Sequence, residues 1–115
     1  MMWKKNNKFG AVKQTYNGYP YHSKMEAKYA MELDLRVKCK DIKSWERQKK
    51  MELTAHGKKI CNYFIDFVIT HNNGSLEYVE IKGFETSTWR LKWKLFEAVM
   101  KATEPKSKLT IIKKV

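Results

Sequence analysis

The stretch NYFIDFVITHNNGSLEYVEIKG, residues 62–83, decides the fold because it holds two strand-forming runs joined by a polar turn. Residues 62–70 are an almost continuous apolar run, which is typical of a central strand that is covered on both faces. Residues 76–83 predict a second strand, and the glycine in the turn between the two runs favours a tight loop. The stretch therefore predicts an antiparallel hairpin within a sheet.

An acid, Asp66, interrupts the apolar run, and its partner across the hairpin depends on the loop. A three-residue loop that ends in Gly74 would set Asp66 opposite Glu80, and Lys82 would lie on the same face. A two-residue loop would set Asp66 opposite Ile81 and separate the two acids. The three-residue loop suits the residues of the turn better.

Two carboxylates that face each other across a sheet repel unless a cation lies between them. Mg²⁺ or Mn²⁺ takes oxygen ligands from one or two carboxylates and completes its shell with water and phosphate. Asp66 and Glu80 are therefore candidate metal ligands. Lys82 is a candidate to position the attacking water and to offset charge at phosphorus.

Residues 23–40 predict a helix, with Ser23 as its N-cap and Glu26 at the spacing of a capping box. Glu26 is also in line with the apolar stripe of this helix, at its N-terminal end. Two interpretations of Glu26 stay open: it only caps the helix, or it also belongs to a functional site.

Further periodic segments surround the central hairpin. Trp89, Trp93, Phe96 and Met100 predict the apolar face of a second helix, which Ser87 or Thr88 would cap. The segments predict an N-terminal hairpin around Asn17-Gly18, a strand at 42–53, the second helix at 87–104 and a last strand at 108–115. We therefore expect one α/β domain over residues 1–115, with residues 1–15 as a basic arm.

The chain carries a large positive charge. Its 115 residues include 24 lysines and arginines against 12 acids, a formal net charge of +12. This excess indicates an anionic partner, most simply nucleic acid. The two cysteines, Cys39 and Cys61, form no zinc-ligand pattern, and we expect neither signal peptide nor membrane anchor. The expected location is the cytoplasm.

The order Glu26, Asp66, Glu80-Ile81-Lys82 resembles the core of the PD-(D/E)XK nuclease superfamily. The segments YHSKMEAKYAMEL, WERQKKMEL, YFIDFVI, EYVEIKGF and WRLKWKLFEAV are similar to successive blocks of a phage family of small Holliday-junction-resolvase-like endonucleases in it. Ile65 departs from the pattern, which has proline there. The resemblance implies a restriction-endonuclease-like core, with a mixed sheet of about four strands flanked by helices, and Mg²⁺-dependent DNA cleavage.

Under this interpretation the metal ligands are Asp66, Glu80 and the Ile81 carbonyl, with Glu26 assisting, and the catalytic residues are Glu26, Asp66, Glu80 and Lys82. The Gln48 position matches a recurring glutamine of the phage family, although a surface strand residue is an equal alternative. The expected DNA-binding residues are Lys4, Lys5, Lys13, Gln48, Arg90, Lys92 and Lys94.

The expected function is metal-dependent, structure-specific cutting of branched DNA such as a Holliday junction, with a homodimer making two symmetric cuts. If the protein is phage-encoded, this would take place in the cytoplasm of the bacterial host. Two alternatives stay open. The chain is a non-catalytic nucleic-acid-binding module with the nuclease fold, or it is a nicking or end-cutting subunit that needs a partner.

Overall fold

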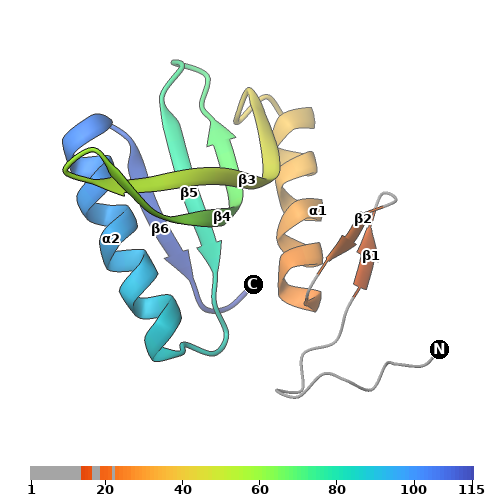
Figure 1. Ribbon diagram of the computed structural model, residues 1–115. Coiled ribbons are helices and arrows are strands. Elements are labelled where there is room, and N and C mark those ends of the chain that lie inside the picture. Colours follow the sequence, from red (N-terminus) through yellow and green to blue (C-terminus); the bar gives the residue numbers. More distant parts are fainter. Residues whose placement is uncertain (1–13, 17–18, 22) are drawn as a thin grey trace.

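The computed structural model describes residues 14–16, 19–21 and 23–115, which form an α/β fold (Figure 1). A two-stranded hairpin comes first, and a helix, three strands, a second helix and a last strand follow. The elements are β1 (Gln14–Tyr16), β2 (Tyr19–Tyr21), α1 (Lys24–Lys38), β3 (Ser44–Ala55), β4 (Lys58–Thr70), β5 (Leu76–Ile81), α2 (Ser87–Thr103) and β6 (Lys108–Ile112). This order confirms the α/β class and the N-terminal hairpin that the sequence predicts.

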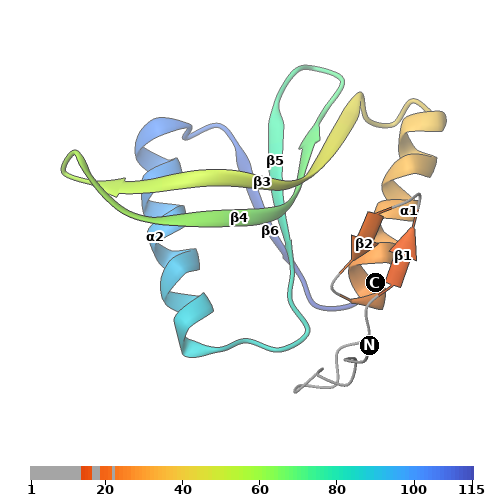
Figure 2. The same ribbon diagram turned by 45° about the vertical axis from the view of Figure 1, so that its right-hand side comes forward.

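Strands β3 to β6 form a mixed sheet in the order β3-β4-β5-β6. β3, β4 and β5 are antiparallel to one another in turn, whereas β6 is parallel to β5 because α2 carries the chain back along the sheet. Helices α1 and α2 cover opposite faces (Figures 1 and 2). The four-stranded mixed sheet flanked by helices is therefore confirmed.

A three-residue loop closes the hairpin between β4 and β5, as its sequence predicts. The N–H of His71 donates to the Ser75 carbonyl at 2.9 Å, and Gly74 adopts a φ of +88°. Glycine suits this left-handed position because it has no Cβ. The Asn73 Oδ1 atom accepts hydrogen bonds from the backbone N–H and the hydroxyl of Ser75, at 2.9 and 2.7 Å. The loop thus fixes the strand register.

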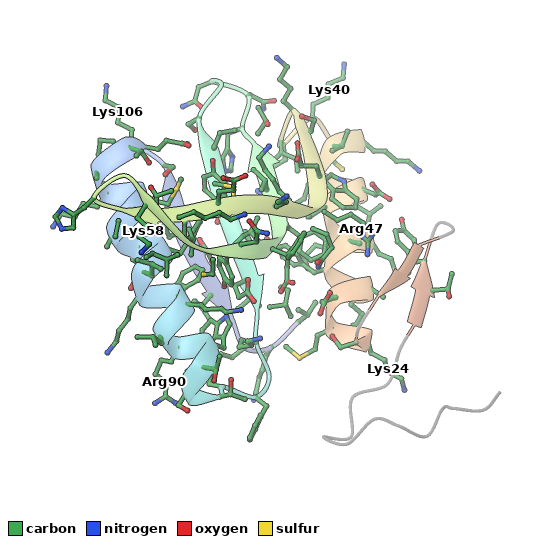
Figure 3. All side chains as sticks on the ribbon, viewed as in Figure 1. Lys24, Lys40, Arg47, Lys58, Arg90 and Lys106 are labelled. Atoms are coloured by element: carbon green, nitrogen blue, oxygen red, sulfur yellow. The ribbon has the colours of Figure 1, made fainter. Side chains whose placement is uncertain are left out.

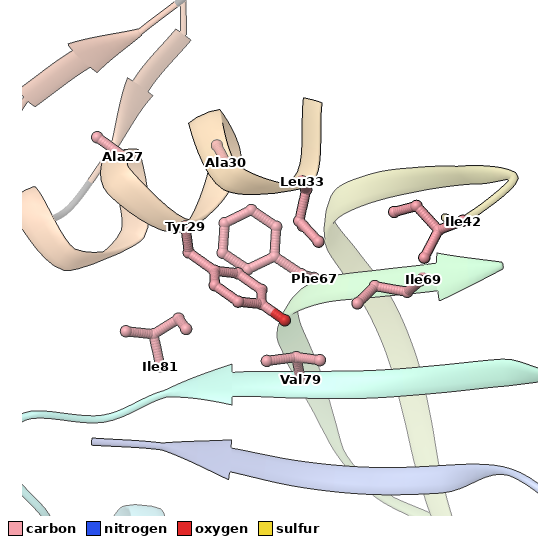
Figure 4. Close-up of a cluster of buried hydrophobic side chains, with 9 residues drawn as sticks. All are labelled: Ala27, Tyr29, Ala30, Leu33, Ile42, Phe67, Ile69, Val79 and Ile81. Carbon is pink, nitrogen blue, oxygen red and sulfur yellow. The ribbon is translucent and has the colours of Figure 1, made fainter. Parts of the chain in front are cut away.

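The face of the sheet toward α1 holds one apolar core (Figure 4). Tyr29 of α1 packs edge-on against Phe67 of β4, with ring centroids 5.3 Å apart. Ala30 and Leu33 of the helix and Val79 of β5 are fully buried around this pair. Because the core uses alternate residues of β4 and β5, the residues between them face α2.

The face toward α2 holds a second core, and the predicted apolar face of this helix is confirmed. Trp89, Trp93, Phe96 and Met100 are its buried residues. The N-cap is Thr86, whose hydroxyl accepts from the Trp89 N–H at 3.1 Å, so the expectation of Ser87 or Thr88 is wrong. The helix begins at Ser87, as predicted, and its cap is the preceding residue because Thr86 lies three residues before the Trp89 N–H that it binds. In the described part of the chain, neither helix is long and apolar enough to cross a membrane.

Strands β4 and β5 separate just beyond the pair formed by Phe67 and Val79. Continuing that register by one residue sets Asp66 opposite Glu80, as the three-residue loop predicts. β4 remains paired with β3, and the two strands cross α2 as a ribbon (Figures 1 and 2). Residues 48–66 are called the β3–β4 ribbon below. The fork between this ribbon and the end of β5 opens next to both acids.

Candidate functional site

Asp66 lies where the two strands separate, and its carboxylate bridges them. Its Oδ2 accepts a hydrogen bond from the backbone N–H of Ile81 at 2.9 Å, and its Oδ1 accepts one from Gln48 Nε2 at 3.2 Å. The carboxylate thus supplies the acceptor that a continuing β4 backbone would offer to β5. Asp66 is only 8% exposed, so the structure holds it in one place.

Gln48 carries strained backbone at this site. Its φ is +50°, although it lies within β3 and its neighbours on both sides keep their pairing with β4. A non-glycine residue in this region costs about 1–3 kcal/mol, and such strain concentrates at functional sites. Gln48 is predicted to contact DNA, and in this structure its amide donates a hydrogen bond to Asp66.

Glu80 is the most buried of the site's charged groups, at 3% exposed. Its Oε2 lies 3.7 Å from Lys82 Nζ, while its Oε1 is buried and has no hydrogen-bond partner among the described residues. Burial, and after it the negative charge of Asp66, raises the pKa of Glu80 to about 8. Lys82, and after it the polar groups of Tyr63 and Trp89, oppose this rise. Near neutral pH the pocket therefore favours a proton or a cation at Glu80.

A second buried acid of the same strand, Glu77, shows the opposite behaviour. It is 7% exposed and faces α1, and its two oxygens lie 2.8 Å from His71 Nε2 and 2.7 Å from the Thr110 hydroxyl. Although burial raises the pKa of Glu77, these hydrogen bonds and nearby Lys108 leave it below its ordinary value. Glu77 is thus satisfied within the fold, whereas Glu80 keeps one free oxygen.

Aromatic residues hold the base of the site. Lys82 Nζ lies 5.1 Å from the centroid of the Trp89 ring, a cation–π contact. The indole N–H of Trp89 donates to the Tyr63 hydroxyl at 3.0 Å. Burial and then the charge of Glu80 raise the pKa of Tyr63 above its ordinary value, so this phenol stays neutral. Trp89 therefore joins the core, as its spacing predicts, and also the site.

A pocket of about 350 Å³ occupies the fork. β5 and the N-terminal part of α2 line one side with Glu80, Lys82, Thr86, Thr88, Trp89 and Lys92. The ribbon lines the other with Gln48, Asn62, Tyr63, Phe64 and Asp66. Asp66, Glu80 and Lys82 thus converge as the register argument predicts. The sequence does not predict Tyr63 and Asn62 as site residues, because their positions depend on how the ribbon lies over α2.

Two larger pockets, of about 490 and 570 Å³, lie around the β4–β5 loop. Loop residues such as Asn73 and Ser75 line both of them, and neither is lined by Asp66, Glu80 or Lys82. The smaller pocket is the better candidate, because opposed carboxylates beside a lysine are what phosphate chemistry uses.

Glu26 lies apart from this pocket. It is buried in the first turn of α1, which packs on the opposite face of the sheet, and it does not line the fork. The Ser23 hydroxyl accepts from the backbone N–H of Glu26 at 3.2 Å, so the predicted N-cap is confirmed. Met25 of the same turn approaches Gly83, which follows Lys82, so α1 reaches the end of β5.

The oxygen atoms of the pocket fit a hard divalent cation such as Mg²⁺. Glu80 Oε1 and Asn62 Oδ1 are both buried without a hydrogen-bond partner among the described residues. In that part of the chain, no three acidic, histidine or cysteine side chains gather at a metal-binding spacing. The fit therefore rests on two carboxylates, Asp66 and Glu80, and Mg²⁺ often binds through one or two carboxylates with water and phosphate.

The residues predicted to bind DNA have different positions. Lys92 lines the pocket, whereas Arg90 and Lys94 are exposed on α2, with Arg90 Nε 3.5 Å from Glu85. Figure 3 shows the labelled side chains of Arg90 at the start of α2 and Lys58 on the ribbon, which belong to the two elements that flank the fork. The remaining three, Lys4, Lys5 and Lys13, lie outside the described residues.

Comparison with known proteins yields one match. Residues 6–114 match the model of a family described as "Protein of unknown function (DUF1064)". No curated protein and no solved structure matches the chain.

Proposed function

Since this chain belongs to the DUF1064 family, whose description assigns no function, we propose from the geometry of its site that it is a metal-dependent endonuclease. It would hydrolyse phosphodiester bonds in DNA. The proposal includes a restriction-endonuclease-like core of the PD-(D/E)XK type. The order Glu26, Asp66, Glu80-x-Lys82 and the mixed sheet between two helices support that assignment.

One observation carries the proposal: the free, buried oxygen of Glu80 lies beside a second carboxylate and a lysine. A buried acceptor atom without a hydrogen bond destabilises a fold by about 1–3 kcal/mol, and Lys82 offsets only part of the cost of burying the Glu80 charge, so the fold favours a proton or cation there. Glu77 is a buried acid of the same strand, β5. It needs no added proton or cation because His71 and Thr110 form hydrogen bonds with its two oxygens. Of these two buried acids of β5, Glu80 is the one that has an oxygen without a hydrogen-bond partner among the described residues.

Each residue of the fork has a separate task. Asp66 is oriented by Ile81 and Gln48, so its carboxylate presents a fixed ligand position. Lys82 holds a positive charge beside Glu80, where it would orient the attacking water and stabilise charge that develops on the phosphoryl oxygens. When bound, Mg²⁺ or Mn²⁺ would neutralise the acids and polarise the phosphate. The Ile81 carbonyl is the proposed third ligand, and Glu26 is proposed only as an accessory acid.

The proposed substrate is branched DNA, with a Holliday junction as the first choice and a homodimer as the active form. The net charge of +12 supports an anionic polymer as the partner. Affinity should fall steeply as salt concentration rises, because lysine and arginine contacts to phosphate release counterions.

Cleavage of labelled duplex, flap, three-way and four-way DNA tests the proposal. The wild type should cut branched DNA with Mg²⁺ or Mn²⁺ and should not cut it in EDTA. Asp66→Ala should abolish cutting, whereas Glu97→Gln, a change to an exposed acid of α2, should leave it unchanged. Binding of all four substrates without metal-dependent cutting would instead indicate a binding module, or a subunit that needs a partner.

A further inference from the structure

Phe64 is exposed at the edge of the candidate site. Its side chain is 52% exposed, although Tyr63 and Ile65 on either side of it are buried. Trp89 and Trp93 of α2 are buried as well, so neither offers a ring face to a ligand. Phe64 also lines the pocket that contains Asp66. Phe64 is thus the exposed aromatic ring of this pocket among the described residues.

Lysines lie on the strand paired with Phe64 and in the same pocket. Lys50 pairs with Phe64 across the ribbon and is exposed, and Lys82 and Lys92 line the same pocket. The acids near this ring are Asp66 and Glu80, which are buried in the same pocket, and Glu52, which is exposed two residues beyond Lys50. An exposed aromatic face beside several cations is the arrangement that single-stranded nucleic acid favours, because bases stack on the ring and phosphates bind the cations.

We propose that Phe64 is a stacking platform for an unpaired base, and that the site therefore takes DNA whose nucleotides are unpaired next to the bound phosphate. This inference rests on the proposed nuclease function and specifies its substrate. A base within a duplex is stacked on both faces and leaves none for Phe64. A base at a branch point or gap has a free face. The lysines would hold the backbone while the ring holds the base.

A second copy of this chain is a less favoured occupant for Phe64. Its surface would bring further positive charge toward Lys50 and Lys92, and like charges at an interface oppose association. Nucleic acid brings the complementary charge. Self-association through Phe64 is therefore an outcome that the test must detect.

The test measures binding in EDTA, where no cleavage occurs, with DNA that carries 2-aminopurine as a single unpaired base or as a paired base in a matched duplex. Phe64→Leu should lower affinity for the unpaired probe about tenfold or more and abolish quenching of its fluorescence, while duplex affinity changes less than about twofold. Phe64→Trp should retain both signals. Because Phe64 is exposed, these variants should fold as the wild type does.

Ile60→Ala is the matched control, because Ile60 is 53% exposed on the same strand but does not line the pocket. It should leave binding of both probes unchanged. Equal loss of affinity for both probes in Phe64→Leu, or no loss for either, overturns the inference. Conversion of a dimer to a monomer by Phe64→Leu, measured by sedimentation, also overturns it. If the unpaired probe shows the predicted loss but the wild type never cuts DNA with Mg²⁺, the nuclease proposal fails and the stacking site remains.

Discussion

The Asp66 carboxylate accepts a 2.9 Å hydrogen bond from the backbone N–H of Ile81 across the point where β4 and β5 separate. The Asp66 side chain thus joins β4 to β5 where their backbone pairing ends, and it also presents a negative charge to the pocket. The two tasks can be separated by substitution, because asparagine keeps the acceptor oxygen and loses the charge.

We expect Asp66→Asn to fold with nearly wild-type stability, since its amide oxygen can accept from Ile81 and its NH₂ group can donate to the Gln48 oxygen once the Gln48 amide turns over. Asp66→Ala should lower the free energy of unfolding by about 1–3 kcal/mol, because it leaves the buried Ile81 N–H without an acceptor. Urea denaturation of both variants measures this. Equal stability of the two would show that the bond has no structural role.

Glu80→Gln should change how stability depends on pH. The pKa of Glu80 is raised from 4.5 to about 8 in the folded state, so the folded protein binds this proton more tightly than the unfolded chain does. The protonated Glu80 thus makes its full contribution to the stability of the folded state below about pH 4.5. This contribution is lost as the pH rises to about 8. In EDTA, the variant should therefore gain stability relative to wild type between these values, by up to a few kcal/mol. A pH-independent difference between the two proteins would contradict the raised pKa.

Divalent ions should stabilise the wild type most at the upper end of this range. At pH 8, millimolar Mg²⁺ should raise its melting temperature by a few degrees relative to EDTA, because the ion binds only the folded state. Neither Asp66→Asn nor Glu80→Gln should show this rise, whereas Glu97→Gln should show it in full. A rise of the same size in all four proteins would place the ion elsewhere on the molecule.

Trp89 should act on cleavage through Lys82. Trp89→Phe keeps an aromatic ring near the ammonium and loses the hydrogen bond to Tyr63, so cleavage should fall only a few-fold. Trp89→Leu loses the ring face as well and should lower the cleavage rate by about 10–100-fold at equal DNA affinity. Tyr63→Phe isolates the loss of the hydrogen bond and should match Trp89→Phe. A smaller effect for Trp89→Leu than for Trp89→Phe would exclude this role.

Asp34 offers a stability change remote from the site. Its carboxylate accepts from the Tyr16 hydroxyl at 2.5 Å and from Trp45 Nε1 at 3.0 Å, and so joins the N-terminal hairpin, α1 and β3. Asp34→Ala should lower the free energy of unfolding by about 1–3 kcal/mol. At a temperature where the variant is folded, its cleavage rate should equal that of the wild type. A selective loss of cleavage would connect α1 to the chemistry and would favour a role for Glu26.

The sequence predicts the part of the site that local rules determine. The three-residue loop, with glycine at its left-handed position, fixes the register, and the register sets Asp66 opposite Glu80. The apolar spacing of Trp89, Trp93 and Phe96 likewise predicts the buried face of α2. Each of these predictions depends on residues that are close in sequence or directly paired.

The remainder depends on packing between distant segments. The separation of β4 from β5 follows from how the ribbon lies over α2, and no local pattern marks it. The left-handed backbone of Gln48 is held by the residues around it and contradicts its local preference. The position of Glu26 depends on which face of the sheet α1 covers, which helical periodicity alone does not determine. Packing between distant segments also leaves Phe64 exposed, although the apolar run that contains it predicts burial.

Single-turnover cleavage of a labelled four-way junction by wild type and Glu80→Gln, with saturating protein and Mg²⁺, tests the central claim most directly. The pocket predicts that the variant binds the junction as tightly as the wild type and cuts it at least about a hundredfold more slowly. Equal rates of cutting by the two proteins would contradict the claim, because the buried acid with the free oxygen would then have no part in the chemistry.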